Sequence, residues 1–303
     1  MSVLLDWATR VAILGITGRF GTFSARDLRD YGTEVVAGVA PGRGGRTIED
    51  VPVFERVEDA VKERGANAAL IYVPAPNALD AVIEAIEGGC SLVAYPGDGL
   101  PVADAMEMRA VARANGANLV GPNSPGLISP GKAKLGFMPS FCYRPGALGL
   151  ISRSGSLSYE AAHRLSNADL GQTTCIGIGG DPVKGLNAAE AIELLHRDPE
   201  TEAIVYLGEI GGSDEYAVAD YAQQGDAKPV AALLVGRTAP PGKKMGHAAA
   251  MIGSYADTWV SKVAALEKAG VQVARSFDRL TDVARNSLAI ARRDYKAVAL
   301  THP

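Results

Sequence analysis

Short apolar, β-branched stretches alternate with amphipathic stretches along almost the whole chain. A run that is apolar on both faces is typical of a parallel strand that helices cover on both sides. Alternation with helical patterns predicts right-handed strand–helix–strand units, and hence an α/β protein with two open, doubly wound sheets. The expected strands are RVAILGI, EVVAGVA, NAALIYVPA, SLVAYPG and ANLVGP in the first half, and ALGLISRS, TTCIGIGG, EAIVYLGEIGG, KPVAALLVGR and VQVARS in the second.

A proline-rich stretch separates the two halves. Four prolines lie between residues 125 and 145, in a segment without sustained periodicity. We expect a crossing segment there rather than a core element. The length of 303 residues suits about two domains. We therefore predict a first domain over residues 1–125, a linker over 126–146 and a second domain over 147–303.

Composition and charge exclude several classes of protein. A formal net charge of −4 argues against a nucleic-acid partner, which would need clustered Lys and Arg. The three cysteines, Cys90, Cys142 and Cys175, are widely spaced in apolar stretches, which fits neither a disulfide framework nor a zinc site. Asp6 and Arg10 interrupt the N-terminal apolar stretch, so we expect no signal peptide. No apolar run reaches the roughly 20 residues of a membrane span. We expect a cytoplasmic enzyme or enzyme subunit.

Glycines follow the first expected strand. Gly15, Gly18 and Gly21 are spaced three apart in GITGRFGTF. Glycines there let the backbone approach a phosphate while helix N–H groups point at it. The spacing is not the GxGxxG of a dinucleotide fingerprint, and the second strand leads to Arg43 instead of a ribose-binding acid, which suits a ligand with additional phosphate. A tight strand-to-helix turn explains the loop equally well.

The next three strands end in turns that contain proline or glycine. YVPAP places Pro74 and Pro76 after the third strand, where they delay a helix and expose an apolar ledge suited to an adenine or an acyl arm. YPGDGLP and GPNSPG follow the next two strands. Because the carboxyl ends of parallel strands meet at one edge of a sheet, these turns predict a ligand cleft.

Two strand ends of the second half carry polar groups. Ser154, Gly155 and Ser156 form an N-cap region, which would present free N–H groups and the positive end of a helix dipole to an anion. Glu209 follows another strand, inside an otherwise apolar run. A carboxylate there usually has a partner, and a solvated carboxylate at a helix start is the alternative.

One histidine follows a strand. His247 lies among small residues in GKKMGHAAAMIG, whereas we expect His163, His196 and His302 to be structural or surface residues. No second ligand stands at metal-binding spacing, so we expect no metal site. An ordinary loop histidine is one possibility, and a histidine approached by a ligand, a phosphoryl group or another chain is the other. A carboxylate on one ring nitrogen would leave the second free as base or nucleophile, and helix N-termini nearby would favour a phosphorylated histidine.

Eight stretches together resemble the alpha subunit of succinyl-CoA synthetase and related nucleotide-dependent acid–CoA ligases. The resemblance implies a Rossmann-like domain that binds coenzyme A, followed by a flavodoxin-like ligase domain with a phosphohistidine. It also implies a separate ATP-grasp beta subunit that binds ATP or GTP with magnesium, in a heterodimer or heterotetramer. The stretches run in order over nearly all of residues 1–290: GITGRFGTF, APGRGG, IYVPAP, GPNSPG, SRSGSLSYEA, GIGGDP, DPETEAIVYLGEIGG and TAPPGKKMGHA.

The resemblance assigns individual residues to roles. His247 falls on the phosphohistidine, Glu209 on the carboxylate that orients it, and Tyr159 on the acid-substrate site. Ser154, Gly155 and Ser156 are the expected phosphate-binding residues. Those expected to bind coenzyme A are Thr17, Gly18, Arg19, Phe20, Arg43, Val73, Pro74, Pro96, Gly97, Asp98 and Asn123.

The chain departs from the family pattern in the cleft between the coenzyme A thiol and the acid. Phe20 replaces Gln, Arg43 replaces Lys, Gly97-Asp98 replaces Thr-Glu, and Ser124 replaces Cys. The phosphorylation half matches closely. We therefore expect an acid–CoA ligase for succinate or a related di- or tricarboxylic acid.

Two other functions compete with this one. A coenzyme A-binding, alpha-like protein without ligase activity would need neither His247 nor Glu209. A nicotinamide-dependent oxidoreductase is disfavoured by the missing GxGxxG and ribose-binding acid. The chain also lacks the GxxxxGK[ST] loop of a nucleotide site, so we expect a partner to supply the nucleotide.

Overall fold

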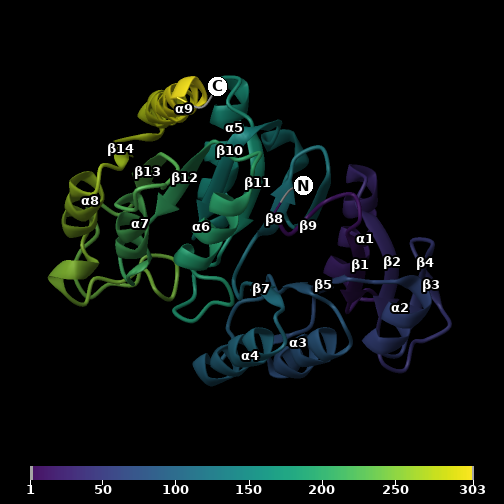
Figure 1. The fold of residues 1–303 in the computed structure, drawn as a ribbon. Helices are drawn as coiled ribbons and strands as arrows, with labels where there is room; N and C mark the ends of the chain where they lie inside the picture. The colour runs from purple at the N-terminus through teal and green to yellow at the C-terminus, as the bar shows by residue number, and fades with distance from the viewer. Residues whose placement is uncertain (1–2, 302–303) are drawn as a thin grey trace. The chain divides into compact units, whose positions relative to one another are not determined.

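The computed structural model describes residues 3–301, with side chains for residues 3–293. The chain divides into two compact units. We call them the N-terminal unit, Leu4–Ser140 with Gly177–Leu186, and the C-terminal unit, which comprises Phe141–Ile176 and the chain from Asn187 onward. Each contains a mainly parallel sheet with helices around it, which confirms the predicted α/β class (Figure 1).

The sheet of the N-terminal unit has the strand order β3-β4-β2-β1-β5-β6-β7. Strand β1 pairs in parallel with β2 on one side and β5 on the other, so the order of strands reverses at β1. Ligands of open α/β sheets bind at this kind of switch point. The elements are β1 (Arg10–Leu14), α1 (Arg19–Tyr31), β2 (Glu34–Val39), β3 (Thr47–Ile48), β4 (Val51–Phe54), α2 (Val57–Arg64), β5 (Ala68–Ile71), η1 (Ala75–Asn77), α3 (Ala78–Glu87), β6 (Leu92–Ala94), α4 (Val102–Ala114) and β7 (Asn118–Val120).

Apolar spacing explains how the helices cover this sheet. In α3 the buried positions recur three or four residues apart, so they form one face that packs into the core. The strands they cover are buried almost throughout. The buried residues of α3 are Ala78, Ala81, Val82, Ala85 and Ile86.

A β-hairpin lies within the segment for which we predict a linker. Its strands, β8 (Gly126–Ser129) and β9 (Ala133–Gly136), pair in antiparallel fashion and are buried. A short 3₁₀ turn, η2 (Ser140–Cys142), follows. We did not predict these strands from the sequence, and the domain boundaries themselves stay a prediction.

The C-terminal unit has the strand order β14-β13-β12-β10-β11. If these five strands are numbered along the chain from β10, their order in the sheet, starting at β11, is 2-1-3-4-5. This is the flavodoxin-like arrangement that we predicted. Each expected strand of the second half is present. The elements are β10 (Pro145–Ser152), α5 (Gly155–Asn167), β11 (Gln172–Gly177), α6 (Ala188–Arg197), β12 (Ala203–Gly208), α7 (Asp214–Ala222), β13 (Val230–Leu234), η3 (Tyr255–Asp257), α8 (Trp259–Lys268), β14 (Gln272–Ala274) and α9 (Phe277–Thr301).

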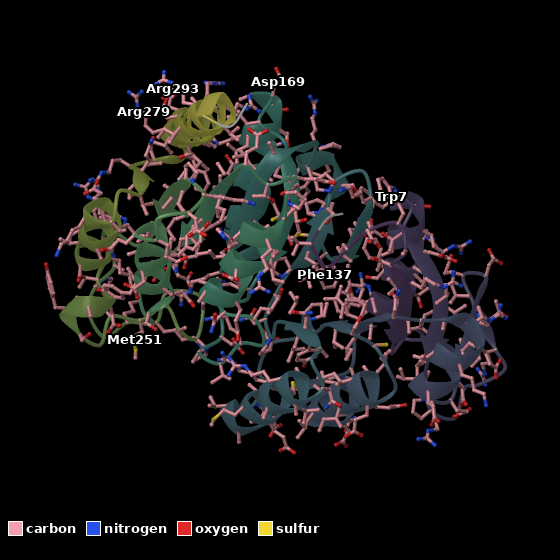
Figure 2. The ribbon with its side chains drawn as sticks, in the orientation of Figure 1. Trp7, Phe137, Asp169, Met251, Arg279 and Arg293 are labelled. Atoms are coloured by element: carbon pink, nitrogen blue, oxygen red, sulfur yellow. The ribbon has the colours of Figure 1, made fainter. Side chains whose placement is uncertain are left out.

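The last helix, α9, carries exposed basic side chains. Figure 2 shows Arg279 and Arg293 projecting from it. His163 and His196 lie on α5 and α6, as expected, whereas His302 is outside the described residues. Within residues 3–301, no helix combines the length and apolar character needed to cross a membrane.

Candidate active site

The turn after β1 brings the backbone close to its neighbours. The φ angle of Gly15 is +77°, and a Cβ there would lie 2.6 Å from the carbonyl oxygen of Tyr72. A Cβ on Gly21 would overlap the backbone of Gly15, so both positions require glycine. Gly18 is the N-cap of α1, where the positive end of the helix favours an anion. This turn and the start of α1 hold four predicted coenzyme A residues: Thr17, Gly18, Arg19 and Phe20.

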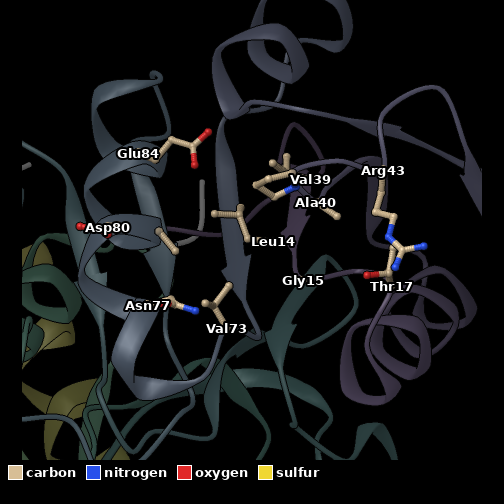
Figure 3. A pocket seen from close by; sticks show the side chains of 12 residues that line it. Leu14, Gly15, Thr17, Val39, Ala40, Arg43, Val73, Asn77, Asp80 and Glu84 are labelled. Atoms are coloured by element: carbon tan, nitrogen blue, oxygen red, sulfur yellow. The ribbon is translucent and has the colours of Figure 1, made fainter.

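A cavity of about 430 Å³ opens beside this turn. Three predicted residues, Thr17, Arg43 and Val73, line it together. In Figure 3 the Arg43 guanidinium points toward Thr17, while Asp80 and Glu84 of α3 lie at the opposite end. A positive charge, a glycine turn and apolar walls thus meet at the switch point of the sheet. The lining residues are Leu14, Gly15, Thr17, Val39, Ala40, Pro41, Arg43, Val73, Asn77, Asp80, Ala81 and Glu84.

The Glu55 carboxylate hydrogen-bonds to the backbone on both sides of Arg43. Its Oε2 accepts a hydrogen bond from the Gly42 N–H at 2.5 Å, and its Oε1 accepts one from the Gly44 N–H at 2.6 Å. These two bonds lower the pKa of the Glu55 carboxyl. Sequence reasoning missed Glu55, because only the folded loop brings its carboxylate to these N–H groups.

The other predicted cleft residues do not line this cavity. Pro74 is the N-cap of η1, and Pro96, Gly97 and Asp98 follow β6. The Asn123 N–H donates to the Gly97 carbonyl at 2.7 Å, so the turns after β6 and β7 lie together. Ser124, one of the departures from the family, bonds the Gly177 carbonyl and accepts from the Gly126 N–H, which gives it a role in holding its own turn.

Phe20 belongs to an aromatic cluster. Its ring centroid lies 6.4 Å from that of Tyr72 and 5.9 Å from that of Phe137, and the latter two rings are 5.2 Å apart. Phe20 is still 61% exposed. The departure from Gln to Phe therefore replaces an amide by an exposed apolar ring beside the glycine turn.

The carboxyl ends of three neighbouring strands form the second group of candidates. Strand β12 pairs in parallel with β10 on one side and β13 on the other. The turn after β10 leads to Ser154, the N-cap of α5, whose side chain makes no capping bond. We expected a capping hydroxyl there, but the Ser154 backbone instead bonds the Ser152 hydroxyl. Gly155 and Ser156 open α5.

Glu209 and His247, from the ends of β12 and β13, are in contact. The Nδ1 atom of His247 lies 2.9 Å from Oε2 and 3.1 Å from Oε1 of Glu209. The His247 side chain is 25% exposed, whereas that of Glu209 is 6% exposed. A buried carboxylate thus fixes the Nδ1 side of a partly exposed imidazole. Met251, farther along the same loop, projects from the ribbon (Figure 2).

A buried network of charges holds Glu209. Arg153 Nη2 lies 3.2 Å from Glu209 Oε1, and Arg153 also ion-pairs with Asp214 and Glu215. Burial opposes the charge of Arg153, but the surrounding carboxylates outweigh it and raise the pKa of the guanidinium. Burial lowers the pKa of the Lys262 ammonium, and the Glu215 carboxylate that it contacts partly offsets this. Sequence reasoning missed Arg153, Glu215 and Lys262, because charged residues in turns and helices are usually solvated.

Tyr159 lies in a different environment. It is on α5, and burial raises the pKa of its hydroxyl to about 12, with Cys175 and Cys142 adding to the effect. The hydroxyl is therefore neutral at physiological pH. In the part of the chain that the structure describes, no group of three or more His, Cys, Asp or Glu side chains could hold a metal ion.

Two family profiles match the chain. The CoA binding domain family matches residues 6–95, and the CoA-ligase family matches residues 151–272. The first covers the sheet with the glycine turn, and the second covers the sheet with Glu209 and His247.

Curated relatives match over most of the length. The alpha subunit of the ADP-forming succinate–CoA ligase of Aquifex aeolicus is 50% identical over 275 residues, covering 90% of each chain. Alpha subunit 2 of the same enzyme from Archaeoglobus fulgidus is 46% identical, covering 91% of this chain and 96% of that one.

Solved structures share the fold. ATP citrate lyase of Methanosaeta concilii, in complex with (3S)-citryl-CoA, superposes with a TM-score of 0.88 at 25% identity, over 95% of this chain and 51% of that one. PH0766 of Pyrococcus horikoshii superposes with a TM-score of 0.69 at 21% identity, over 91% of this chain and 59% of that one. The chain thus spans about half the length of the first of these structures.

Proposed function

Because the chain belongs to the succinate–CoA ligase alpha-subunit family, we propose that it is the alpha subunit of a nucleotide-dependent acid–CoA ligase. The reaction joins an acid and coenzyme A and converts a nucleoside triphosphate to the diphosphate and phosphate. The acid is succinate or a related di- or tricarboxylic acid. An oxidoreductase is not compatible with this family.

The hydrogen bond between His247 and Glu209 is the observation that carries this proposal. Donation from Nδ1 to the carboxylate leaves the lone pair on Nε2. Nε2 attacks the terminal phosphorus of the triphosphate, whose bond to the bridging oxygen breaks, and the diphosphate leaves. A carboxylate oxygen of the acid then takes the phosphoryl group from Nε2. The coenzyme A thiolate attacks the resulting acyl phosphate, and phosphate leaves as acyl-CoA forms.

The chain's own groups support each binding requirement. The N-terminus of α5 at Ser154, Gly155 and Ser156 suits the transferring phosphoryl group. Tyr159 is the proposed contact for the acid. The glycine turn leaves room for a pyrophosphate against the backbone, and Arg43 faces the adjoining cavity. These features fit coenzyme A in the N-terminal unit.

A partner completes the enzyme in this proposal. We assign the nucleotide, as ATP or GTP with magnesium, to an ATP-grasp beta subunit that forms a heterodimer or heterotetramer with this chain. The chain itself has no GxxxxGK[ST] loop. A cytoplasmic location is part of the same proposal.

Acyl-CoA formation by the complex with its cognate beta subunit tests the proposal. Variant His247→Asn should lose turnover by at least about 10³-fold, since the nucleophile is gone. Variant His163→Asn is the matched control, because this histidine lies on α5, where its ring nitrogen hydrogen-bonds to Asn167 of the same helix. Coenzyme A binding without turnover by the unaltered complex, over a panel of di- and tricarboxylic acids, would favour the alternative of a binding protein without ligase activity.

A further inference from the structure

Five charged side chains are buried together at the carboxyl end of β12. Arg153 and Lys262 are almost completely buried, and so are the carboxylates of Glu209 and Glu215, while Asp214 is 12% exposed. Burying a charge costs several kcal/mol even after relaxation, and apolar residues of similar size often pack at least as stably. A cluster of three anions and two cations therefore calls for a reason beyond stability.

The two cations share the Gly211 carbonyl and the Glu215 carboxylate, but they contact different atoms of Glu209. Lys262 Nζ donates to the backbone carbonyls of Glu209, at 3.0 Å, and Gly211, at 2.5 Å, and it pairs with Glu215. Arg153 also reaches a backbone carbonyl, that of Gly211, at 2.7 Å. Its Nη2, in contrast, lies against the carboxylate of Glu209. At Glu209 itself, Lys262 thus bonds the main-chain carbonyl, whereas Arg153 forms an ion pair with the carboxylate, without a hydrogen bond from Nη2.

The Oε1 atom of Glu209 lies between the guanidinium of Arg153 and the imidazole of His247. Arg153 Nη2 is 3.2 Å away on one side, and His247 Nδ1 is 3.1 Å away on the other. The guanidinium fixes the carboxylate against the imidazole and also cancels part of its charge. Without that cation, a buried anion would face the imidazole uncompensated, and it would favour the protonated ring.

We propose that Arg153 is a positioning residue for the phosphorylation of His247: through its ion pair it keeps the carboxylate of Glu209 against Nδ1, and it favours the neutral imidazole at working pH. This inference rests on the proposed function. The charged groups packed around the pair are Arg153 from the turn after β10, Asp214 and Glu215 from α7, and Lys262 from α8. The exposed Lys243 and Lys244 precede His247 on its own loop.

Arg153→Met in the complex with the cognate beta subunit tests the role. The experiment measures the single-turnover rate of ³²P transfer from radiolabelled ATP with magnesium to this chain, across pH. Among the remaining side chains of the cluster, the imidazole has the ordinary pKa closest to neutral pH. Once the cation is removed, the imidazole is therefore the first group to take up a proton. We expect labelling about tenfold slower at neutral pH, with the acid limb of the profile displaced upward by about one pH unit. Arg153→Lys, which keeps the charge, should keep the acid limb in place.

A double variant distinguishes positioning from a general structural defect. Arg153→Met combined with Glu209→Gln removes the cation together with the anion that it balances, so this protein should fold even if Arg153→Met alone does not. If Arg153 acts through Glu209, the double variant labels no more slowly than Glu209→Gln alone. If the double variant instead lost as much labelling rate as the product of the two single losses, the proposal would be contradicted. A pH profile of labelling for Arg153→Met identical to that of the parent would contradict it too.

The labelling experiment also distinguishes failure of the proposed function from failure of the positioning role. If His247→Asn is labelled like the parent, the histidine is not the acceptor and the proposed function fails, whatever the Arg153 variants do. If the label depends on His247 but is indifferent to Arg153, only the positioning role is overturned. Coenzyme A affinity, measured in parallel, should remain at the parent value in each variant, because the predicted coenzyme A residues lie in the N-terminal unit.

Discussion

Arg43 brings a permanent positive charge to the cavity of the N-terminal unit. If the cavity accepts a phosphate-bearing part of coenzyme A, Arg43→Ala should weaken binding by about 1.5–3 kcal/mol, the range for a hydrogen bond to a charged group. Calorimetric titration with coenzyme A checks this. Arg56→Ala is the control, since this exposed arginine pairs with Glu58 and does not line the cavity. Equal affinities of the two variants would remove Arg43 from the binding site.

The Glu55 carboxylate should make the order of the Arg43 loop, and hence coenzyme A affinity, depend on pH. The pKa of its carboxyl is lowered from the ordinary 4.5, so its bonds to Gly42 and Gly44 are complete above 4.5 and are lost as the pH falls through the folded-state pKa. Glu55→Ala should bind coenzyme A severalfold more weakly at about pH 7, because the Arg43 loop is less ordered. As the pH falls through the folded-state pKa of Glu55, the two proteins should converge. An affinity ratio that stays constant over this range would show that the carboxylate does not order the loop.

The residues of the candidate site were predictable where they follow a strand of clear pattern. Glu209 directly follows an apolar run, His247 lies on the long loop after another, and the structure brings them into contact. Arg153, Lys262 and Glu55 were not predictable, since charged residues in turns and helices are usually solvated. Lys262 is buried because α8 packs its face onto the end of β12, and sequence spacing does not report this.

At the scale of elements, the buried parallel strands were the part of the fold easiest to predict. Strands such as β5 and β12 consist of continuous apolar runs, which the helices on both faces require. The hairpin β8–β9 was missed, because its segment contains glycines, prolines and the buried charge of Lys134. Strand β3 spans two residues only, too few for any period to show.

Lys134 explains how a charged residue can belong to a buried strand. Its Nζ pairs with Asp27 of α1 at 2.8 Å and donates to the Met138 carbonyl at 3.2 Å and the Ser140 hydroxyl at 3.0 Å. Its side chain is 0% exposed. The amine therefore joins the hairpin to the helix that starts at the glycine turn.

Lys134→Met should destabilise the N-terminal unit. Loss of the amine leaves the Met138 carbonyl and the Asp27 carboxylate without this donor, at a cost of about 1–3 kcal/mol. Urea unfolding, with hydrogen exchange to locate the effect at β9 and α1, measures it. The exposed Lys62 of α2 offers the matched substitution, Lys62→Met, which should change stability by less than about 0.5 kcal/mol. A Lys134→Met protein as stable as that control would contradict the anchoring role.

At the scale of the whole molecule, the proposed function is divided between two sheets. The glycine turn and cavity lie at one switch point, and the pair of His247 and Glu209 lies at the strand ends of the other sheet. Each sheet has its own family match. We expect the acid that the enzyme uses to depend on a few side chains such as Phe20.

The chain alone should be catalytically incomplete. In the proposed mechanism the nucleotide binds to the partner, so pure chain mixed with acid, coenzyme A, ATP or GTP and magnesium should form no acyl-CoA above background. It should still bind coenzyme A. Addition of the cognate beta subunit should restore turnover. Turnover by the chromatographically pure chain would show that the nucleotide site lies within this protein.

The central claim is that His247 carries the phosphoryl group. The most direct measurement is to incubate the complex with ATP and magnesium, omit acid and coenzyme A, and locate the phosphoryl group by mass spectrometry under alkaline conditions. We predict one phosphoryl group on His247 that is labile to acid and stable to alkali, released when the acid and coenzyme A are added, and missing from His247→Asn. A phosphoryl group on any other residue, or normal labelling of His247→Asn, would contradict the account.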